Sequence, residues 1–207
     1  MKKKFSSQQL LVLFTSLLAL LLLFGMVIQK SFFPSTFQLN QLNNPLIGSA
    51  SAPIKMFLIE DLNCGYCRRF TKEIFPQIEK LYLATGKASC LFVPVSFLHD
   101  SKPLANACLA VYHHSPDRFG AYLHALFEHF AEEADLLPLA EQVGGINLEK
   151  LAECMETGCY YAQIKKNYLW AKELMGPGFG TPALYINGIR TPTASFALIS
   201  EQIEKQL

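Results

Sequence analysis

The first thirty residues combine a basic start with a long apolar run. Lysines occupy positions 2–4, and an uncharged, mostly apolar stretch of 19 residues follows from Leu10 to Ile28. As a helix that rises about 1.5 Å per residue, this stretch spans roughly 28 Å, close to the hydrocarbon thickness of a bilayer. No small-x-small cleavage site follows it until Ala50-Ser51-Ala52, which lies too far downstream. The pattern predicts an uncleaved membrane anchor, a signal-anchor over residues 1–30, with the lysines on the cytoplasmic side.

A polar segment separates this anchor from a folded body. Residues 31–52 contain scattered prolines, many Ser, Asn and Gln and few charges, which predicts a linker. The apolar run Ile54–Ile59 then predicts a buried strand. Apolar residues at helical spacing follow from Cys64 to near Gly86, with a kink expected at Pro76. A second strand is expected over Ser89–Phe97.

The second half of the body is dominated by helical periods. Apolar residues recur at helical spacing from about Pro103 to Met175, which predicts an all-helical insertion over about 100–176. A strand over Ala183–Ile186 is then followed by a tight turn at Asn187-Gly188 into a short partner strand, and by a closing helix over Phe196–Leu207. The order predicts an α/β sheet domain that is interrupted by a helical insertion.

Composition and charge support a folded domain and argue against nucleic acid as a partner. The chain is 51% hydrophobic and only 17% charged, enough to bury a sizeable core. Its formal net charge is +1, but residues 1–30 hold four lysines and no acid. The rest of the chain therefore carries 14 basic and 17 acidic groups. The mildly acidic body, residues 53–207, lacks the basic surface that nucleic-acid binding requires.

The motif Cys64-Gly65-Tyr66-Cys67 lies where the first strand gives way to the first helix. A thiol at a helix N-terminus faces unpaired backbone N–H groups and the positive end of the helix dipole. Both stabilise the thiolate and lower its pKa from about 8.5 into the range of about 3.5–7.5. The two-residue spacer allows a small disulfide between the cysteines. We expect Cys64 to be the sulfur that meets substrates and Cys67 to be the shielded, resolving thiol.

A zinc site is the main alternative for these cysteines. Structural zinc sites most recognisably use two C-x-x-C pairs, or one pair with two suitably spaced histidines. The chain has no second C-x-x-C, because Cys154 and Cys159 are five residues apart, and the adjacent His113 and His114 would face different directions on a helix. The sequence therefore predicts neither a metal site nor a cofactor.

Three motifs together resemble a known family. They are Asp61–Cys67, Gly180-Thr181-Pro182-Ala183 and Ile186-Asn187-Gly188. In this order they resemble the thioredoxin superfamily, specifically the envelope thiol-disulfide oxidoreductases of the DsbA and DsbC/DsbG kind. The resemblance covers about residues 50–207 and implies a thioredoxin fold. It also implies that Pro182 is a cis-proline opposite the cysteines and that the Thr181 backbone pairs with an extended substrate segment.

Details of the motifs point in two directions within this family. Many members carry a buried acid six residues before the first cysteine for proton transfer; that position here is Leu58, and Glu60 is the candidate replacement. The Gly-Tyr spacer and Thr181 resemble DsbC, whereas the long helical insertion resembles DsbA, and residues 31–52 are too short for the DsbC dimerisation domain. Without a histidine in the spacer we expect a milder oxidant than DsbA.

Four further cysteines lie outside the motif. By resemblance to several DsbA-like proteins, Cys108 pairs with a cysteine near the end of the insertion, with Cys154 the preferred partner and Cys159 the alternative. Cys90 lies in a predicted buried strand and is expected to be a core residue. Among the lone histidines, His99 follows a strand and is a candidate for the active face.

The sequence leads to one functional hypothesis with two alternatives. The hypothesis is a membrane-anchored, extracytoplasmic thiol-disulfide oxidoreductase, a DsbA-like dithiol oxidase in which the Cys64–Cys67 pair oxidises cysteines of exported proteins. Residues 10–28 would hold it in the inner membrane, with the catalytic domain facing the periplasm or extracytoplasmic space and a membrane partner reoxidising the pair. The alternatives are a DsbC/DsbG-like reductase or isomerase and a non-enzymatic peptide-binding chaperone module.

Overall fold

The computed structural model divides the chain into two compact units, Met1–Gln38 and Leu39–Leu207. It describes residues 8, 12–22, 43–129 and 132–207. In the first unit residues 12–22 are helical, and the large apolar side chains of this segment are all more than half exposed. The remainder of the predicted membrane span 10–28 lies outside the described residues. Within the described ranges, no helix is both long enough and apolar enough to cross a membrane.

The second unit is built on one five-stranded sheet with the strand order β1-β3-β2-β4-β5. The central strands β2 and β3 are parallel, and every other neighbouring pair is antiparallel. Because β2 and β3 run the same way, Asp61 and Val95 end them at the same edge of the sheet. The strands are β1 (Leu46–Gly48), β2 (Ile54–Asp61), β3 (Ala88–Val95), β4 (Ala183–Ile186) and β5 (Ile189–Thr191).

Helices connect these strands in three groups. The crossover from β2 to β3 is made by α3 (Gly65–Glu73), α4 (Phe75–Ile78) and a π-helical turn, η1 (Glu79–Leu83). The chain closes with α10 (Phe196–Glu204). Between β3 and β4 lies the insertion, made of α5 (Ser101–His114), η2 (Pro116–Arg118), α6 (Phe119–His129), η3 (Glu133–Asp135), α7 (Leu136–Val143), α8 (Leu148–Thr157), α9 (Tyr161–Met175) and η4 (Gly176–Gly178).

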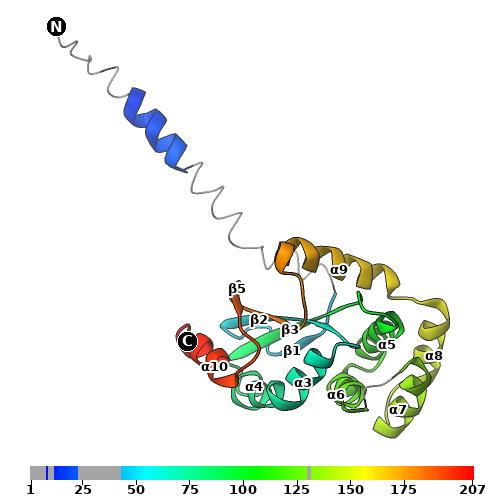
Figure 1. Cartoon of the computed structure of the whole chain (residues 1–207). Coiled ribbons are helices and arrows are strands. Elements are labelled where there is room, and N and C mark those ends of the chain that lie inside the picture. Colours follow the sequence, from blue (N-terminus) through cyan, green and yellow to red (C-terminus); the bar gives the residue numbers. More distant parts are fainter. Residues whose placement is uncertain (1–7, 9–11, 23–42, 130–131) are drawn as a thin grey trace. The chain divides into compact units, whose positions relative to one another are not determined.

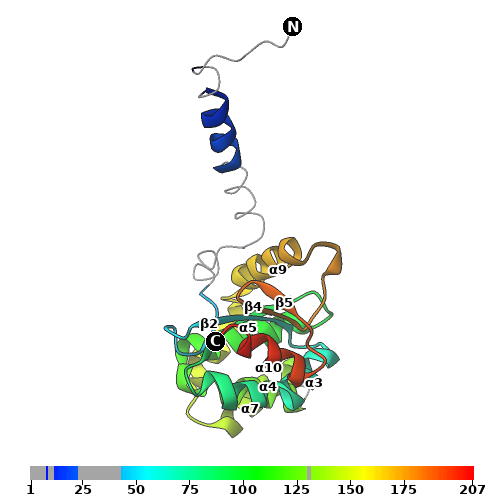
Figure 2. The same ribbon diagram turned by 90° about the vertical axis from the view of Figure 1, so that its left-hand side faces the viewer.

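The alternation of side chains along β2 creates two apolar cores. Met56 and Leu58 point into the larger core, which includes residues of α3, α4, α10 and the insertion helices. Phe57 and Ile59 point to the other face, where Ala171 of α9 covers them. Figures 1 and 2 show α9 alone on one side of the sheet, with α3, α4 and α10 on the opposite side. Burial on both faces explains the nearly continuous apolar sequence of β2 and β3.

Several local predictions are confirmed. The segment between β3 and β4 is helical, as predicted, and its helical turns run from Ser101 to Gly178, against expected limits of about 100–176. The helix that starts after Cys64 breaks at Ile74, and Pro76 lies in the first turn of the next helix, as expected for a residue that cannot donate a hydrogen bond. Asn187 and Gly188 both have positive φ, as a two-residue hairpin turn requires.

The start of the folded body differs from the prediction. Leu46–Gly48 pairs with β3 as an edge strand, and the side chain of Asn44 is buried and exchanges two hydrogen bonds with Asn167 of α9, at 2.9 and 3.1 Å. Residues 44–48 therefore belong to the sheet domain and not to the predicted linker 31–52. A three-residue strand is too short to show an alternating pattern, and its partners are distant in sequence. Linker positions 31–42 lie outside the described residues.

Candidate functional site

Cys64 and Cys67 lie at the N-terminus of α3, at the edge of the sheet where β2 ends. Cys64 occupies the N-cap position with extended backbone angles, and α3 begins at Gly65. Cys67 is one turn further into the helix and fully buried, whereas 8% of Cys64 is exposed. Both are free thiols in the structure. The difference in exposure has the direction that the sequence predicts, with Cys64 the less buried of the two.

The two thiols have opposite acidities. The pKa of Cys64 is lowered to about 5, chiefly because the Cys67 thiol donates a hydrogen bond to its thiolate. The side chain of Thr181 and the backbone N–H groups of Cys67 and Tyr66 add to this stabilisation, and partial burial opposes it. Burial raises the pKa of Cys67, and its hydrogen bond to Cys64 raises it further. Cys64 is thus the reactive thiolate at neutral pH.

The segment before β4 places a second functional element against Cys64. The Thr181–Pro182 peptide bond is cis, as the family resemblance implied. The Cys64 sulfur donates a hydrogen bond to the backbone oxygen of Thr181, with the two atoms 3.4 Å apart. When both thiols are neutral, the buried hydroxyl of Thr181 has no hydrogen-bond partner among the described residues. It is therefore available to donate to the Cys64 thiolate when that forms.

A pocket of about 310 Å³ opens beside this pair of segments. Its apolar walls include Phe70 and Pro182, its polar rim includes Arg69 and Thr193, and Tyr66 stands at its border with 75% of its surface exposed. The pocket connects the cis-proline segment to the helix that carries the cysteines. The sequence did not single out Arg69 and Phe70 of α3 as pocket residues. Their position within one turn after Cys67 was a usable signal.

Comparison with known proteins agrees with this geometry. A family model described as Thioredoxin matches residues 40–205. The chain belongs to the thioredoxin family. Disulfide bond formation protein D of Bacillus subtilis is 28% identical over 172 residues, covering 79% of this chain and 77% of that protein.

Solved structures refine the assignment. The crystal structure of Chlamydia trachomatis DsbA is 32% identical with a TM-score of 0.71, covering 78% of this chain and 90% of that one. Oxidised BdbD of Bacillus subtilis is 28% identical with the same TM-score, covering 79% and 92%. This member of the thioredoxin family is therefore a DsbA-like thiol-disulfide oxidoreductase, an enzyme of the class whose chemistry the Cys64–Cys67 motif predicts.

A buried acid lies next to the shielded cysteine of this oxidoreductase. Glu60 is fully buried and follows Leu58 on the same face of β2, because residues two apart on a strand share a face. Burial raises the pKa of the Glu60 carboxyl well above its usual value, and the hydroxyl of Thr71 donates to it at 3.1 Å. Glu60 thus lies on the face where the usual acid of this family would project, as the sequence suggested, and Leu58 supplies only packing.

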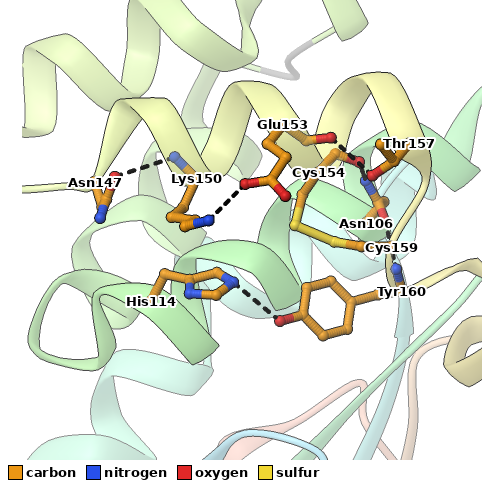
Figure 3. Close-up of a disulfide and its surroundings, with 9 residues drawn as sticks. All are labelled: Asn106, His114, Asn147, Lys150, Glu153, Cys154, Thr157, Cys159 and Tyr160. Carbon is orange, nitrogen blue, oxygen red and sulfur yellow. Dashed lines mark hydrogen bonds and ion pairs between the residues drawn. A yellow bond between two sulfur atoms is a disulfide. The ribbon is translucent and has the colours of Figure 1, made fainter.

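The second disulfide differs from the prediction. Cys154 is bonded to Cys159, and Cys108 is a free, fully buried thiol, so the predicted Cys108–Cys154 pair is wrong. On α5 it is Asn106 that faces the α8–α9 turn: its amide donates to the backbone oxygen of Cys154 at 2.6 Å (Figure 3). Cys108 lies two residues further along α5 and therefore points about 160° away from Asn106, on a different face of the helix.

The turn between α8 and α9 explains why the observed pair forms. Gly158 ends α8 in the left-handed conformation, with φ of 63°, which reverses the chain and brings the Cα atoms of Cys154 and Cys159 within 5.1 Å. The backbone N–H of Tyr160 donates to Asn106 at 2.9 Å, so α5 holds both sides of the turn. A glycine between two cysteines at the end of a helical pattern was the signal available in the sequence.

Cys90 and His99 are the remaining candidates from the sequence. Cys90 is fully buried in β3, and burial raises its pKa, as expected of a core thiol. The imidazole of His99 is largely exposed and pairs with the adjacent carboxylate of Asp100, while its backbone oxygen accepts a hydrogen bond from Asn63. In the described part of the chain, no group of three or more His, Cys, Asp or Glu side chains is placed to bind a metal ion.

Proposed function

We propose that this enzyme works as a dithiol oxidase on cysteines of exported proteins. The observation that carries the proposal is the position of Cys64 at the N-terminus of α3, beside Cys67 and Thr181, which lowers its pKa to about 5. A stabilised thiolate stabilises the reduced form of the pair, which makes its disulfide more oxidising. The similarity to C. trachomatis DsbA and to BdbD supports this direction of electron flow.

The first step of the proposed reaction is attack by a substrate thiolate on the Cys64 sulfur of the oxidised pair. The Cys64–Cys67 bond breaks, a mixed disulfide forms between substrate and Cys64, and Cys67 leaves with the electron pair. A thiolate at Cys67 is unfavourable because burial raises its pKa. Glu60, whose raised pKa keeps it protonated, supplies the proton that Cys67 takes up.

The second step transfers the disulfide to the substrate. A second substrate thiolate attacks the substrate sulfur of the mixed disulfide, and Cys64 leaves as the thiolate that Cys67 and Thr181 stabilise. The substrate loses two electrons and the enzyme pair gains them. The substrate segment pairs with the backbone of Thr181, beside Cys64, in the manner of an added strand. A membrane partner then reoxidises the pair.

The reduction potential of the Cys64–Cys67 pair tests the direction. We expect a value between those of DsbA, about −120 mV, and thioredoxin, about −270 mV, on the oxidising side of about −200 mV. Equilibration of the full chain with glutathione buffers measures it. A value below about −200 mV favours the reductase or isomerase alternative, which the DsbC-like Thr181 and Gly65-Tyr66 spacer support.

Replacing Cys64 by Ser separates catalysis from binding. If the chain is an oxidase, C64S abolishes disulfide transfer to a reduced two-cysteine peptide. If the chain instead works as a peptide-binding chaperone through the pocket beside Pro182, C64S retains its ability to suppress aggregation of an unfolded protein. Activity that survives the substitution contradicts the proposed mechanism.

We propose further that the enzyme is anchored in the inner membrane with its catalytic domain outside the cytoplasm. The lysines at positions 2–4 before the apolar run 10–28 support this orientation. The Cys154–Cys159 disulfide is also typical of oxidising compartments. Alkaline extraction of membranes, followed by protease treatment of cells with a permeabilised outer envelope, tests both parts. A chain that is extracted by alkali, or that is protected from the protease, contradicts the proposal.

A further inference from the structure

Asp61, the last residue of β2, is a fully buried carboxylate that the exchange steps above do not use. It lies three residues before Cys64. Its Oδ1 accepts a hydrogen bond from the backbone N–H of Asn63 at 2.9 Å. Its Oδ2 accepts hydrogen bonds from a second segment, which comprises the loop between β3 and α5 and the first residue of α5. The donors to Oδ2 are the backbone N–H groups of Phe97 (2.9 Å) and Leu98 (3.1 Å) and the hydroxyl of Ser101 (3.0 Å).

These bonds join the two loops at the active edge of the sheet into one unit. The backbone N–H of Cys64 donates to the backbone oxygen of Asp61 at 3.0 Å. The side-chain amide of Asn63 donates to the backbone oxygen of His99 at 2.7 Å. The loop that presents Cys64 is therefore held directly to the β3–α5 loop. A shift of either loop would break hydrogen bonds to the buried side chain of Asp61, which accepts four of them.

An aromatic contact extends this unit to the cis-proline segment. The ring of Phe97 packs edge to face against that of Phe179, with centroids 4.9 Å apart and planes at 76°. Tyr168 of α9 packs against Phe179 from another side, at 5.5 Å. Phe179 lies between Gly178 and Gly180, two residues before Thr181. The two glycines give this segment high conformational freedom, and the side chain of Phe179 anchors it. The side chain of Arg190 also donates a hydrogen bond to the backbone oxygen of Gly178.

We propose that Asp61 is a positioning residue for disulfide exchange, which acts through Phe97 and Phe179 to hold the Thr181 backbone in register with the Cys64 sulfur. The proposal rests on the proposed function, in which a substrate pairs with Thr181 while its sulfur reacts at Cys64. A peptide must contact Thr181 and Cys64 at the same time. A change in the spacing of these two segments therefore slows the reaction of a peptide but not that of a small thiol, which contacts Cys64 alone. A misplacement of about 1 Å can slow a reaction by about 10²-fold.

The test compares two substrates in the full chain. A peptide with two cysteines meets both Thr181 and Cys64, whereas dithiothreitol meets Cys64 alone. We expect Phe97→Ala to raise KM for the peptide by about tenfold, the effect of losing one aromatic contact, and to leave the rate with dithiothreitol unchanged. Asp61→Asn replaces an acceptor oxygen by a donor and should show the same signature. Leu169→Ala, an exposed α9 side chain next to Tyr168, is the control and should change neither reaction.

The double variant Asp61→Asn/Phe97→Ala decides whether the two residues act by one route. We expect its KM for the peptide to be no higher than that of the worse single variant, because both changes release the same segment. Additive effects would mean that Phe97 contacts the substrate directly, and equal losses with both substrates would mean a general loss of structure; either result overturns the proposal. If Asp61→Asn fails to fold, Phe97→Ala and Phe179→Ala supply the cycle. A wild-type chain that oxidises no peptide refutes the proposed function instead.

Discussion

The hydroxyl of Thr71 donates hydrogen bonds to both carboxyl oxygens of Glu60, at 3.1 and 3.3 Å, inside the core behind Cys67. Thr71 comes from the helix that carries the cysteines, and Glu60 from the strand that precedes them. The Glu60 carboxyl is fully buried within the described domain, so no water shell compensates for a charge there. An acid in this setting is held in its neutral form.

Glu60 should make the stability of the enzyme fall as the pH rises. Its folded pKa is raised, so its contribution is complete below the unfolded pKa of about 4.3 and is lost as the pH rises through the folded pKa. Glu60→Gln keeps an acceptor for Thr71 and removes the titration. We expect the variant to gain stability relative to the wild type as the pH rises from about 4.3 to 8. Denaturant unfolding at several pH values measures the difference in unfolding free energy between the variant and the wild type.

The same variant should also slow disulfide exchange. The amide introduced by Glu60→Gln cannot supply a proton to Cys67, and loss of general acid catalysis typically costs about 10²-fold or more. Glu141→Gln, a change at an exposed position of α7, is the control for both measurements. A Glu60→Gln enzyme with wild-type exchange rates would show that the Cys67 proton comes from elsewhere.

The thiolate of Cys64 should titrate with a pKa of about 5 in the reduced enzyme. Ultraviolet absorbance of the thiolate measures this midpoint directly. Cys67→Ala should raise it more than any other single change around Cys64, because the Cys67 thiol is the largest source of thiolate stabilisation. Cys90→Ala should leave it in place, since Cys90 stays protonated in the core. An unshifted midpoint in Cys67→Ala would assign the low pKa to the helix N-terminus instead.

The titration of Cys64 should make the reduced form less stable as the pH falls, which is opposite to the effect of Glu60. The folded pKa of Cys64 is lowered, so its contribution is complete above the unfolded pKa of about 8.5 and is lost as the pH falls through about 5. The oxidised form lacks this group. The difference in unfolding free energy between reduced and oxidised enzyme should therefore shift in favour of the oxidised form as the pH is lowered.

Thr181→Val should make the enzyme a weaker oxidant. The threonine hydroxyl lowers the pKa of Cys64, and valine has the same shape without the donor. A lost hydrogen bond worth about 1–2 kcal/mol corresponds to a potential more negative by roughly 20–40 mV. Equilibration with glutathione measures the change. Thr193→Val, a substitution at the pocket rim, is the matched control; equal shifts in both variants would contradict a specific role for the Thr181 hydroxyl.

The Cys154–Cys159 disulfide should support stability without taking part in exchange. Its cysteines are five residues apart, and closure of so short a loop is worth about 2 kcal/mol in the chain-entropy model. We expect Cys154→Ser/Cys159→Ser to lower the free energy of unfolding by about that amount. Its rate of peptide oxidation should equal that of the wild type. Alkylation of the unfolded, unreduced chain should label Cys108, and an unlabelled Cys108 would contradict the observed pairing.

The sequence predicted the parts of the enzyme whose signals are local or carried by motifs. The strand-to-helix junction at Cys64 and the turn at Asn187-Gly188 follow from backbone chemistry and were predicted as such. The cis bond at Pro182 came from family resemblance, because nothing in the chemistry of one X-Pro bond distinguishes its isomers. The presence of a helical insertion followed from the change between strand and helix periods.

What the sequence missed depends on contacts between distant segments. The short strand Leu46–Gly48 is defined by its pairing with β3, and the role of Asp61 by donors that lie 36 to 40 residues further on. The pairing of Cys154 required knowing that Asn106, and not Cys108, faces the turn of α8. Each of these depends on which face of an element meets its neighbour, which periodicity alone does not give.

Both edge strands of the sheet, β1 and β5, are only three residues long. Long exposed edges recruit other extended chains and lead to aggregation, and short edge strands are one way in which proteins limit this. In the proposed function, the substrates of this enzyme are such extended chains. With little backbone left unpaired along its sheet edges, it offers an incoming chain few places to form a strand pair away from Thr181. The brevity of β1 and β5 thus limits edge pairing between the catalytic domain and other chains, and in the proposed function it leaves the Thr181 backbone as the place where a substrate segment pairs.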